Sequence, residues 1–308
     1  MDSKQMEKIM AVAKDIEKKQ GKGSIYSLGS KAANMGVKRT STELEDLDSI
    51  LGGGLPKGRM IEIFGPESSG KTSLAYHLCS LYEMCLFIPA EGTFDIQRAK
   101  MFGNKPKQML VYRDCTYAED VITACNKFAT AGIPLIVIDS VPHMVPKALY
   151  EQTLKDAEKQ PQRGQLAALF SRCLKPLNDI IENTGTTIVF INQVRDKMDA
   201  MLFGEKFDTP GGRALKHAMS VRIQVGRRAW IEVPNKNPAN SASSEKAGLI
   251  MKAKVVKSKV CNPYGEAELP MFFDRGFVSF EDLDSTRKEI MQRNNELYSK
   301  RKKVKDDE

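Results

Sequence analysis

The pattern of apolar positions divides this chain near residue 46. Before that point, residues 3–20 carry apolar side chains at helical spacing, which predicts an amphipathic helix that ends at Gly21. Residues 21–45 are rich in Gly, Ser and Lys, and they predict a linker with one short apolar patch at residues 25–28. The apolar face of the helix needs a cover, which either its own domain or a neighbouring subunit would supply.

After residue 46, short apolar runs alternate with helical stretches. The runs occupy residues 60–64, 85–90, 109–113, 135–140, 187–192 and 221–225. Continuous apolar strands separated by helices are typical of a parallel sheet that is covered on both faces. Two further runs, 249–259 and 268–273, flank the turn-like stretch "VCNPYGEA" and predict an antiparallel hairpin at the sheet edge.

The sequence therefore predicts an α/β fold, with a mostly parallel central sheet flanked by helices and with antiparallel edge strands. It also predicts three parts: an N-terminal helix and linker (1–45), a core (46–280) and a short charged helix with a basic tail (281–308). The tail contains "SKRKKVK", residues 299–305, and such a run is more often a solvated tail than a defined site.

Composition narrows the class of protein. The 308 residues, 41% of them hydrophobic, suffice for one large core with a small appendage. Neither a membrane-spanning run nor an apolar signal segment is present, which favours an intracellular protein. The six cysteines include no CxxC pair, so reduced thiols are favoured over a zinc site or a disulfide framework. The net charge of +8 suits a polyanionic partner, although solubility alone also explains it.

A strand, a glycine-containing loop and a helix follow one another in "MIEIFGPESSGKTSLAYHL". The glycines let backbone N–H groups turn toward an anion, and the helix N-terminus adds its positive end. Lys71 would reach the β- and γ-phosphates of a nucleotide, and the Thr72 hydroxyl would hold Mg²⁺. The predicted phosphate site comprises Gly65, Pro66, Glu67, Ser68, Ser69, Gly70, Lys71, Thr72 and Ser73.

Polar residues follow three of the apolar runs. Asp139 ends the run "LIVID", a pattern that is weak alone but strong beside a phosphate loop, and it would act on Mg²⁺. Glu91 follows another run and is a candidate for orienting an attacking water, with a surface carboxylate as the alternative. Asn192 and Gln193 end a third run, where an amide would sense the γ-phosphate or simply cap the strand.

Six blocks of the chain resemble the bacterial and phage RecA recombinases. They are "IEKKQGKGSIYSLG", "GGGLPKGRMIEIFGPESSGKTSL", "VIDSV", "FINQVRDKM", "GGRALKHAMSVRIQV" and "KVVKSK", in the family's order over roughly residues 12–275. The resemblance implies a RecA-like ATPase core that binds ATP and Mg²⁺. It also implies a DNA-dependent ATPase that forms a filament on single-stranded DNA. That filament would pair with homologous double-stranded DNA and exchange strands in recombination and repair.

The same resemblance implies roles for individual residues. Glu91 matches the family's catalytic glutamate, and Gln193 matches its γ-phosphate sensor. Lys257 and Lys259 match a pair that reaches the phosphates held by the neighbouring protomer, although without the resemblance a solvated edge strand would be favoured. The N-terminal helix would dock on that neighbour and build a helical filament with ATP between protomers. Asp95 and Arg98 complete the implied nucleotide site, with Arg98 near a position that usually carries a tyrosine.

Two segments, 152–164 and 194–210, would line a DNA groove, and Gly211 and Gly212 would close the second. Basic residues there would contact phosphates, and apolar residues of the second segment would insert between bases or pack on the core. The candidate DNA-binding residues are Arg163, Gly164, Lys175, Arg195, Lys197, Met198, Phe203, Gly211, Gly212 and Arg213.

The chain also departs from the family. Pro89 stands where a carboxylate is common, and His217 replaces a bulky aromatic residue of the protomer interface. Residues 299–305 would replace, by phosphate attraction, the duplex contact of the family's further C-terminal domain. Two alternatives stay open: a RecA-like DNA-binding scaffold with weak ATP turnover, and a hexameric RecA-like helicase. The expected location is the bacterial cytoplasm, with a phage as a further source of such a chain.

Overall fold

The computed structural model describes residues 2–21, 24–25, 36–155, 164–196, 207–234 and 244–306. The chain forms two compact units, Met1–Lys38 and Arg39–Glu308. The second unit begins at Arg39, where β1 (Arg39–Thr40) pairs with β2 (Leu55–Pro56). The Arg39 guanidinium also donates to the carbonyls of Leu51 and Val260, at 2.8 and 2.5 Å.

The first unit contains the predicted N-terminal helix. This helix, α1 (Ser3–Gln20), ends at Gly21 with φ of 103°. Its apolar side chains Met6, Ile9 and Met10 are 50–54% exposed, and α1 buries none of its residues. Residues 26–28 of the predicted apolar patch lie outside the described part of the chain.

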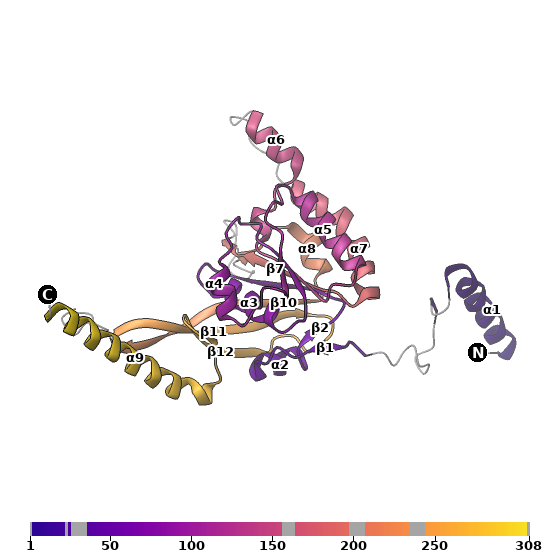
Figure 1. Ribbon diagram of the computed structural model, residues 1–308. Coiled ribbons are helices and arrows are strands. Elements are labelled where there is room, and N and C mark those ends of the chain that lie inside the picture. The colour runs from indigo at the N-terminus through magenta and orange to yellow at the C-terminus, as the bar shows by residue number, and fades with distance from the viewer. Residues whose placement is uncertain are drawn as a thin grey trace. The chain divides into compact units, whose positions relative to one another are not determined.

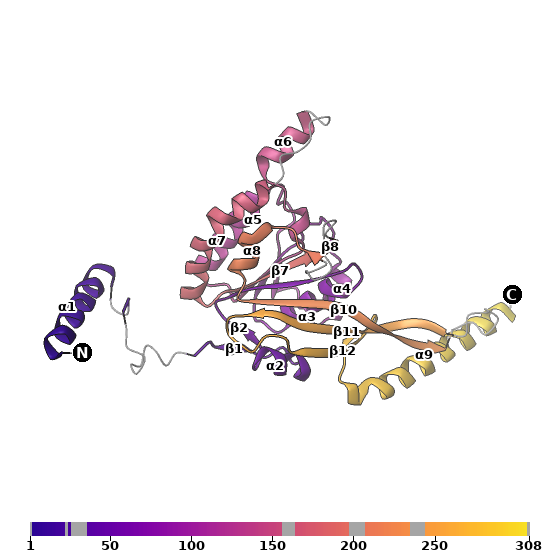
Figure 2. The same ribbon diagram turned by 180° about the vertical axis from the view of Figure 1, so that it is seen from behind.

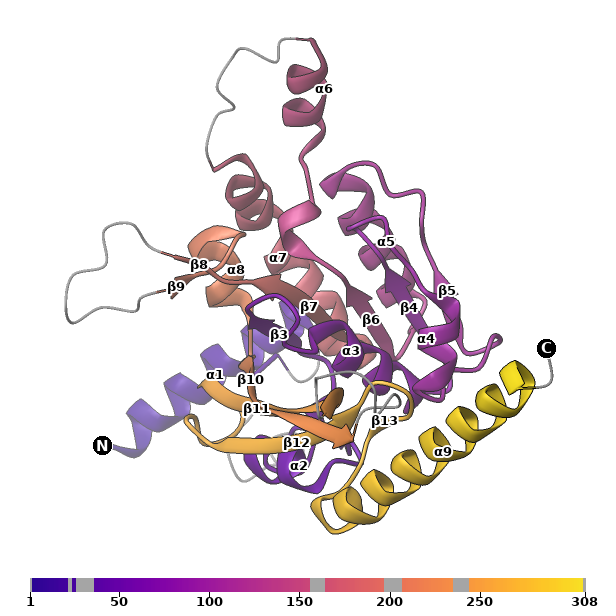
Figure 3. The same ribbon diagram turned by 90° about the vertical axis from the view of Figure 1, so that its left-hand side faces the viewer.

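The second unit (Figure 1) is built on a nine-stranded sheet in the order β13-β12-β11-β10-β3-β7-β6-β4-β5, and Figure 3 labels these strands. Strands β10, β3, β7, β6, β4 and β5 are parallel neighbours, as the apolar runs predict. Strands β11, β12 and β13 continue the sheet in antiparallel fashion. The strands are β3 (Met60–Gly65), β4 (Cys85–Ile88), β5 (Met109–Val111), β6 (Leu135–Ile138), β7 (Thr187–Gln193), β10 (Val221–Pro234), β11 (Ser244–Ser258), β12 (Glu266–Phe272) and β13 (Gly276–Phe277).

Helices cover both faces of the parallel strands (Figure 2, Figure 3). On one face, side chains of α2 (Glu45–Leu51), α3 (Lys71–Ser80) and α4 (Ile96–Met101) share a core with the sheet. On the other face, α5 (Ala118–Thr130), α7 (Gln165–Thr184) and α8 (Gly212–Ala218) form a second core. The sheet is therefore buried between two apolar layers, which explains why its strands read as continuous apolar runs. No helix within the described ranges is long and apolar enough to cross a membrane.

Strands β10 and β11 are longer than predicted and form an antiparallel ribbon beyond the parallel sheet. The sequence indicated only residues 221–225 of β10, because the rest, "GRRAWIEVP", contains three charged residues and is only partly buried. The predicted C-terminal helix is present as α9 (Phe280–Asp306), and its Ile290 packs with Ile231, Val233 and Phe272 of the ribbon and β12.

Candidate nucleotide site and nucleic-acid interface

The phosphate loop joins the end of β3 to the start of α3. Gly65 has no room for a side chain, since a Cβ there would lie 2.0 Å from the carbonyl oxygen of Val225. Gly70 adopts φ of 88° and caps α3, a backbone conformation that suits glycine. The loop therefore turns back tightly on the sheet, and the ten-residue helix α3 starts with Lys71 at its mouth.

Lys71 lies over the loop. Its ammonium donates to the carbonyl oxygens of Gly65 and Pro66, at 3.0 and 2.7 Å. Burial lowers the pKa of Lys71, and the carboxylates of Asp139, Glu67 and Glu91 oppose that shift. A cation that is held in place and partly desolvated attracts an anion strongly.

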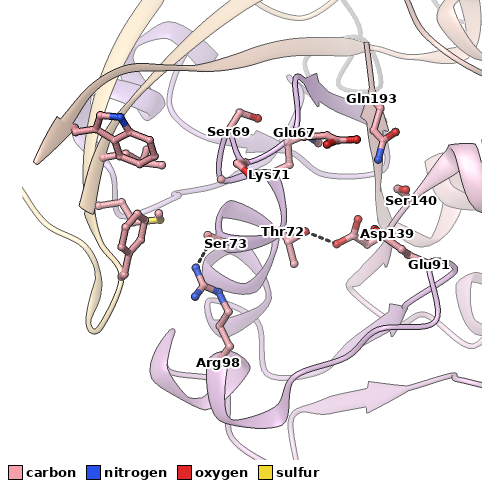
Figure 4. A pocket seen from close by; sticks show the side chains of 16 residues that line it. Glu67, Ser69, Lys71, Thr72, Ser73, Glu91, Arg98, Asp139, Ser140 and Gln193 are labelled. Carbon is pink, nitrogen blue, oxygen red and sulfur yellow. Dashed lines mark hydrogen bonds between the residues drawn. The ribbon is translucent and has the colours of Figure 1, made fainter. Parts of the chain in front are cut away.

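Thr72 and Asp139 face each other across the base of the site. The Thr72 hydroxyl donates to Asp139 Oδ2 at 2.7 Å, as Figure 4 shows. Burial raises the pKa of Asp139, and the Thr72 bond together with the charge of Lys71 lowers it. A hydroxyl and a carboxylate are oxygen ligands of the kind that Mg²⁺ prefers, so the residues present fit this ion.

These groups line a cavity of about 670 Å³. One end is polar and holds the phosphate loop; the other end is formed by Trp230, Leu249, Met271 and Phe273. The Ser69 hydroxyl is buried and has no hydrogen-bond partner among the described residues, so it has a free donor. A cavity with a polar and an apolar end fits a nucleotide, whose phosphates and base differ in the same way.

Glu91 and Gln193 reach the same cavity from the ends of β4 and β7, the two strands that flank β6 (Figure 4). The backbone N–H of Glu91 donates to the carbonyl of Asp139 at 3.1 Å, which fixes the turn that carries the glutamate. Gln193 and Asn192 have different environments: the Gln193 side chain lines the cavity, whereas Asn192 is fully buried. Only Gln193 of this pair is thus placed to meet a phosphate.

Arg98 lines the cavity and donates to the Ser73 hydroxyl at 3.1 Å. Asp95 is committed elsewhere, because its carboxylate caps α4 by accepting from the backbone N–H groups of Gln97 and Arg98. Asp95, Gly65 and Pro66 do not line the cavity, whereas the other predicted phosphate-site residues do.

Lys257 and Lys259 do not line the chain's own nucleotide cavity. The Lys257 ammonium donates to the carbonyl oxygens of Lys216 and His217, at 2.5 and 3.2 Å, and Lys259 donates to His217 at 3.0 Å. Both lysines thus bind the C-terminal end of α8, where a cation is favourable. Burial, and then the charges of Lys259 and Arg222, lower the pKa of Lys257 to about 8.

The first predicted DNA segment, 152–164, overlaps the end of a helix. Helix α6 (Lys147–Lys155) includes residues 152–155, because "KALYEQTLK" consists of good helix formers. Gly164 caps the start of α7 with φ of 92°. Lys175 lies inside α7, where its ammonium pairs with Asp179 at 2.7 Å, so it is not a loop residue.

The two ends of the second predicted segment pair with each other, since β8 (Arg195–Asp196) is antiparallel to β9 (Phe207–Asp208). Arg195 and Arg213 are exposed, as a phosphate contact requires. Gly211 and Gly212 begin α8, and a Cβ on Gly212 would lie 2.7 Å from Ala167 Cβ. The remaining candidates, Arg163, Lys197, Met198 and Phe203, lie outside the described residues.

A buried polar cluster behind the site was not predicted. It joins Glu62 of β3, Arg222 of β10 and Asn192 of β7. Each is fully or largely buried, and Glu62 and Arg222 are neighbours in the β3–β10 register. A signal existed in the sequence: "MIEIF" and "VRIQV" each place one charged residue inside an apolar strand.

Comparison with known proteins gives consistent results. A family model described as the RecA N-terminal domain matches residues 7–278. Protein RecA of Helicobacter pylori (strain P12) is 37% identical over 281 residues, covering 90% of this chain and 77% of that protein. Protein RecA of Campylobacter jejuni subsp. jejuni serotype O:23/36 (strain 81-176) is 36% identical over 282 residues, covering 90% of this chain and 78% of that protein.

The crystal structure of the RadB recombinase has a similar fold, with a TM-score of 0.56 over 77% of this chain and 98% of that chain. The two sequences are 20% identical, so this likeness bears on the fold alone. It agrees with the predicted RecA-like architecture. On the family model and the two bacterial relatives, the chain belongs to the RecA family.

Proposed function

We propose that this chain is a RecA-type recombinase, a DNA-dependent ATPase that assembles on single-stranded DNA and exchanges strands with a homologous duplex. Its work would take place in the bacterial cytoplasm, and the phage source stays a prediction. The observation that carries the proposal is the single cavity that Lys71, Thr72, Glu91, Asp139 and Gln193 line together in a chain of this family.

Nucleotide binding would use the two unlike ends of the cavity. The phosphates would lie on the backbone N–H groups of the loop and at the N-terminus of α3. Lys71 would exchange the carbonyls of Gly65 and Pro66 for phosphate oxygens, and the Ser69 hydroxyl would gain a partner. Thr72 and Asp139 would hold Mg²⁺, which would neutralise phosphate charge when bound.

Hydrolysis would need residues from two protomers. Glu91 would orient the attacking water at one side of the cavity. Lys257 and Lys259 of the neighbouring protomer would stabilise the developing charge, and to do so they would leave the end of α8. Helix α1 would supply the contact between protomers, because its half-exposed apolar residues need a partner surface.

DNA binding would involve Arg195, Arg213 and the segment that starts after Gln193. Because Gln193 lines the nucleotide cavity, a contact with the γ-phosphate would alter the geometry of that segment. Such order–disorder coupling would make DNA affinity depend on the bound nucleotide.

A scaffold with weak ATP turnover is the second candidate. Pro89, in place of the common carboxylate, and the lysines bound to α8 both favour slow hydrolysis in the free protomer. The family assignment does not favour the hexameric helicase.

ATP hydrolysis with and without single-stranded DNA separates the first two readings. We expect strong stimulation by DNA in the wild type and a loss of turnover, by roughly two orders of magnitude or more, in Glu91→Gln. The variant should still bind DNA in the presence of ATP. A wild-type rate that ignores DNA would favour the scaffold.

A further inference from the structure

Glu62 is the centre of the buried polar cluster behind the nucleotide site. It lies on β3, shortly before the phosphate loop begins at Gly65, and its side chain is 0% exposed. Asn192 Nδ2 donates to Glu62 Oε1 at 2.8 Å, and Arg222 Nε donates to Glu62 Oε2. A carboxylate at this depth is tolerated only with such partners, so the three side chains form one unit.

The same two donors also hold the end of the segment 194–210. Asn192 Nδ2 donates to the carbonyl oxygen of Pro210 at 2.9 Å. Arg222 Nη2 donates to the Thr209 hydroxyl at 3.2 Å, and Thr209 is only 4% exposed. The exit of the segment is thus fixed to Glu62 through two separate hydrogen bonds.

The entrance of the segment is fixed to the same unit. Asn192 Oδ1 accepts from the backbone N–H of Gln193 at 3.0 Å. In the parallel register, Asn192 pairs with Phe64 and Gln193 pairs with Gly65. Gln193 is therefore bound on its main chain to the cluster, while its side chain lines the nucleotide cavity.

Arg222 also contacts the strand that leads into the phosphate loop. Its guanidinium lies over the ring of Phe64, 4.6 Å from the ring centroid. Phe64 directly precedes Gly65, the first residue of the loop. Phe64, Gln193 and the end of the segment thus each contact Arg222 or Asn192, the two side chains that bind the Glu62 carboxylate.

We propose that Glu62 and Arg222 are positioning residues that couple the nucleotide site to the DNA-binding segment 194–210, with Thr209 as the contact on the segment. The inference rests on the proposed function. If the cluster only stabilised the fold, a change in it would weaken DNA binding equally with either nucleotide. If the cluster couples the two sites, a change in it would alter how DNA affinity depends on the nucleotide.

Thr209 offers the cleanest test, because removal of Glu62 or Arg222 would leave a buried charge unpaired and threaten the fold. Thr209→Val deletes the hydroxyl that Arg222 binds, and Thr209→Ser keeps it. Thr187→Val is the matched control: Thr187 is buried at the opposite end of β7, and its hydroxyl donates to the carbonyl of Pro56 at 3.1 Å.

The measurement is the dissociation constant of a fluorescent single-stranded oligonucleotide with the full chain, in ATPγS and in ADP. The dissociation constant in ADP divided by that in ATPγS reports the coupling. We expect Thr209→Val to lower this ratio by about fivefold or more, and we expect Thr209→Ser to keep the wild-type ratio. Thr187→Val should keep the wild-type ratio even if its unfolding midpoint falls as far as that of Thr209→Val.

Equal ratios in Thr209→Val and Thr187→Val, beside a wild type that prefers ATPγS, would overturn the inference and leave the proposed function standing. A wild-type ratio near one would show that the nucleotide does not control DNA binding, and it would contradict both the inference and the proposed function. Thermal unfolding of all four proteins shows whether each variant is folded.

Discussion

Thr72→Val tests the contact at the base of the nucleotide site. The change removes the hydroxyl that donates to Asp139 Oδ2 at 2.7 Å and keeps the shape of the side chain. Asp139 is only 7% exposed, so water replaces the lost donor poorly. A hydrogen bond to a charged group contributes about 1.5–3 kcal/mol. We expect the free energy of unfolding of the ligand-free variant to fall by about this amount, whereas Thr72→Ser should stay near wild type.

This effect should depend on pH through Asp139. Burial raises the pKa of Asp139, so the folded protein binds this proton more tightly than the unfolded chain does. The stability contribution of this group therefore falls as pH rises above the ordinary carboxyl range, near about 3.9. The Thr72 bond opposes that loss because it stabilises the ionised form. The difference between Thr72→Val and wild type should thus be largest at neutral pH and should shrink at acidic pH.

Urea unfolding with and without MgATP measures the free energy of unfolding of each variant and the stability that it gains from the ligand. A ligand at one hundred times its dissociation constant stabilises a folded protein by about 2.7 kcal/mol. Wild type and Thr72→Ser should gain this stability, and Thr72→Val should gain much less because it lacks one ligand for Mg²⁺. Equal unfolding free energies of the Val and Ser variants at neutral pH, with equal gains from MgATP, would refute the reasoning.

Three further predictions concern other parts of the core. The fluorescence of Trp230, the sole tryptophan, should change when MgATP is added, because its ring lines the apolar end of the cavity. This change should vanish in Lys71→Ala. An unchanged spectrum of the wild type at saturating MgATP would contradict this position of the ligand. Gly211→Ala should lower the free energy of unfolding, measured in urea, by about 2–4 kcal/mol, because the new Cβ would lie 2.6 Å from Leu215 Cδ2 at a φ of 99°. The control is Gly132→Ala, which has a φ of 82° and open space, so it should lose only the smaller amount due to its backbone conformation. An equal loss in both variants would exclude steric conflict as the cause. The pKa of Lys257 is lowered to about 8, so above that pH the unfolded chain binds more protons than the folded protein does. The free energy of unfolding should therefore rise from about pH 8 to about pH 10. Lys257→Met should make this rise smaller, by less than about 1 kcal/mol because solvent screens the charge, and an unchanged pH profile would contradict the pKa shift.

The sequence was sufficient to predict the parallel sheet, the phosphate loop and the place of Asp139, because each has a local signature. An apolar run buried on both faces and a glycine-containing turn before a helix need no knowledge of distant residues. The apolar end of the cavity could not be found in this way. Trp230 and Phe273 come from the ribbon and from the turn after β12. The antiparallel pairing of β10 with β11 and of β11 with β12 brings them to the cavity that the loop also lines.

Two of the candidate site residues have local partners that the sequence pattern did not indicate. Lys175 has the charge for a phosphate contact, but Asp179 lies one helical turn away and pairs with it. Asp95 has a carboxylate near the cavity, but the start of α4 uses it as a cap. Glu62 and Arg222 were overlooked for the opposite reason: their charges are hidden in apolar strands, and only the β3–β10 register pairs them.

Formation of joined DNA molecules tests the central claim most directly. The wild-type chain would be mixed with circular single-stranded DNA and a linear duplex, in MgATP or MgADP, with a homologous or an unrelated duplex. We expect joint molecules only with the homologous duplex and only with ATP. Tight, ATP-dependent binding to single-stranded DNA without any homology-dependent joint molecules would contradict the recombinase and leave the scaffold in its place.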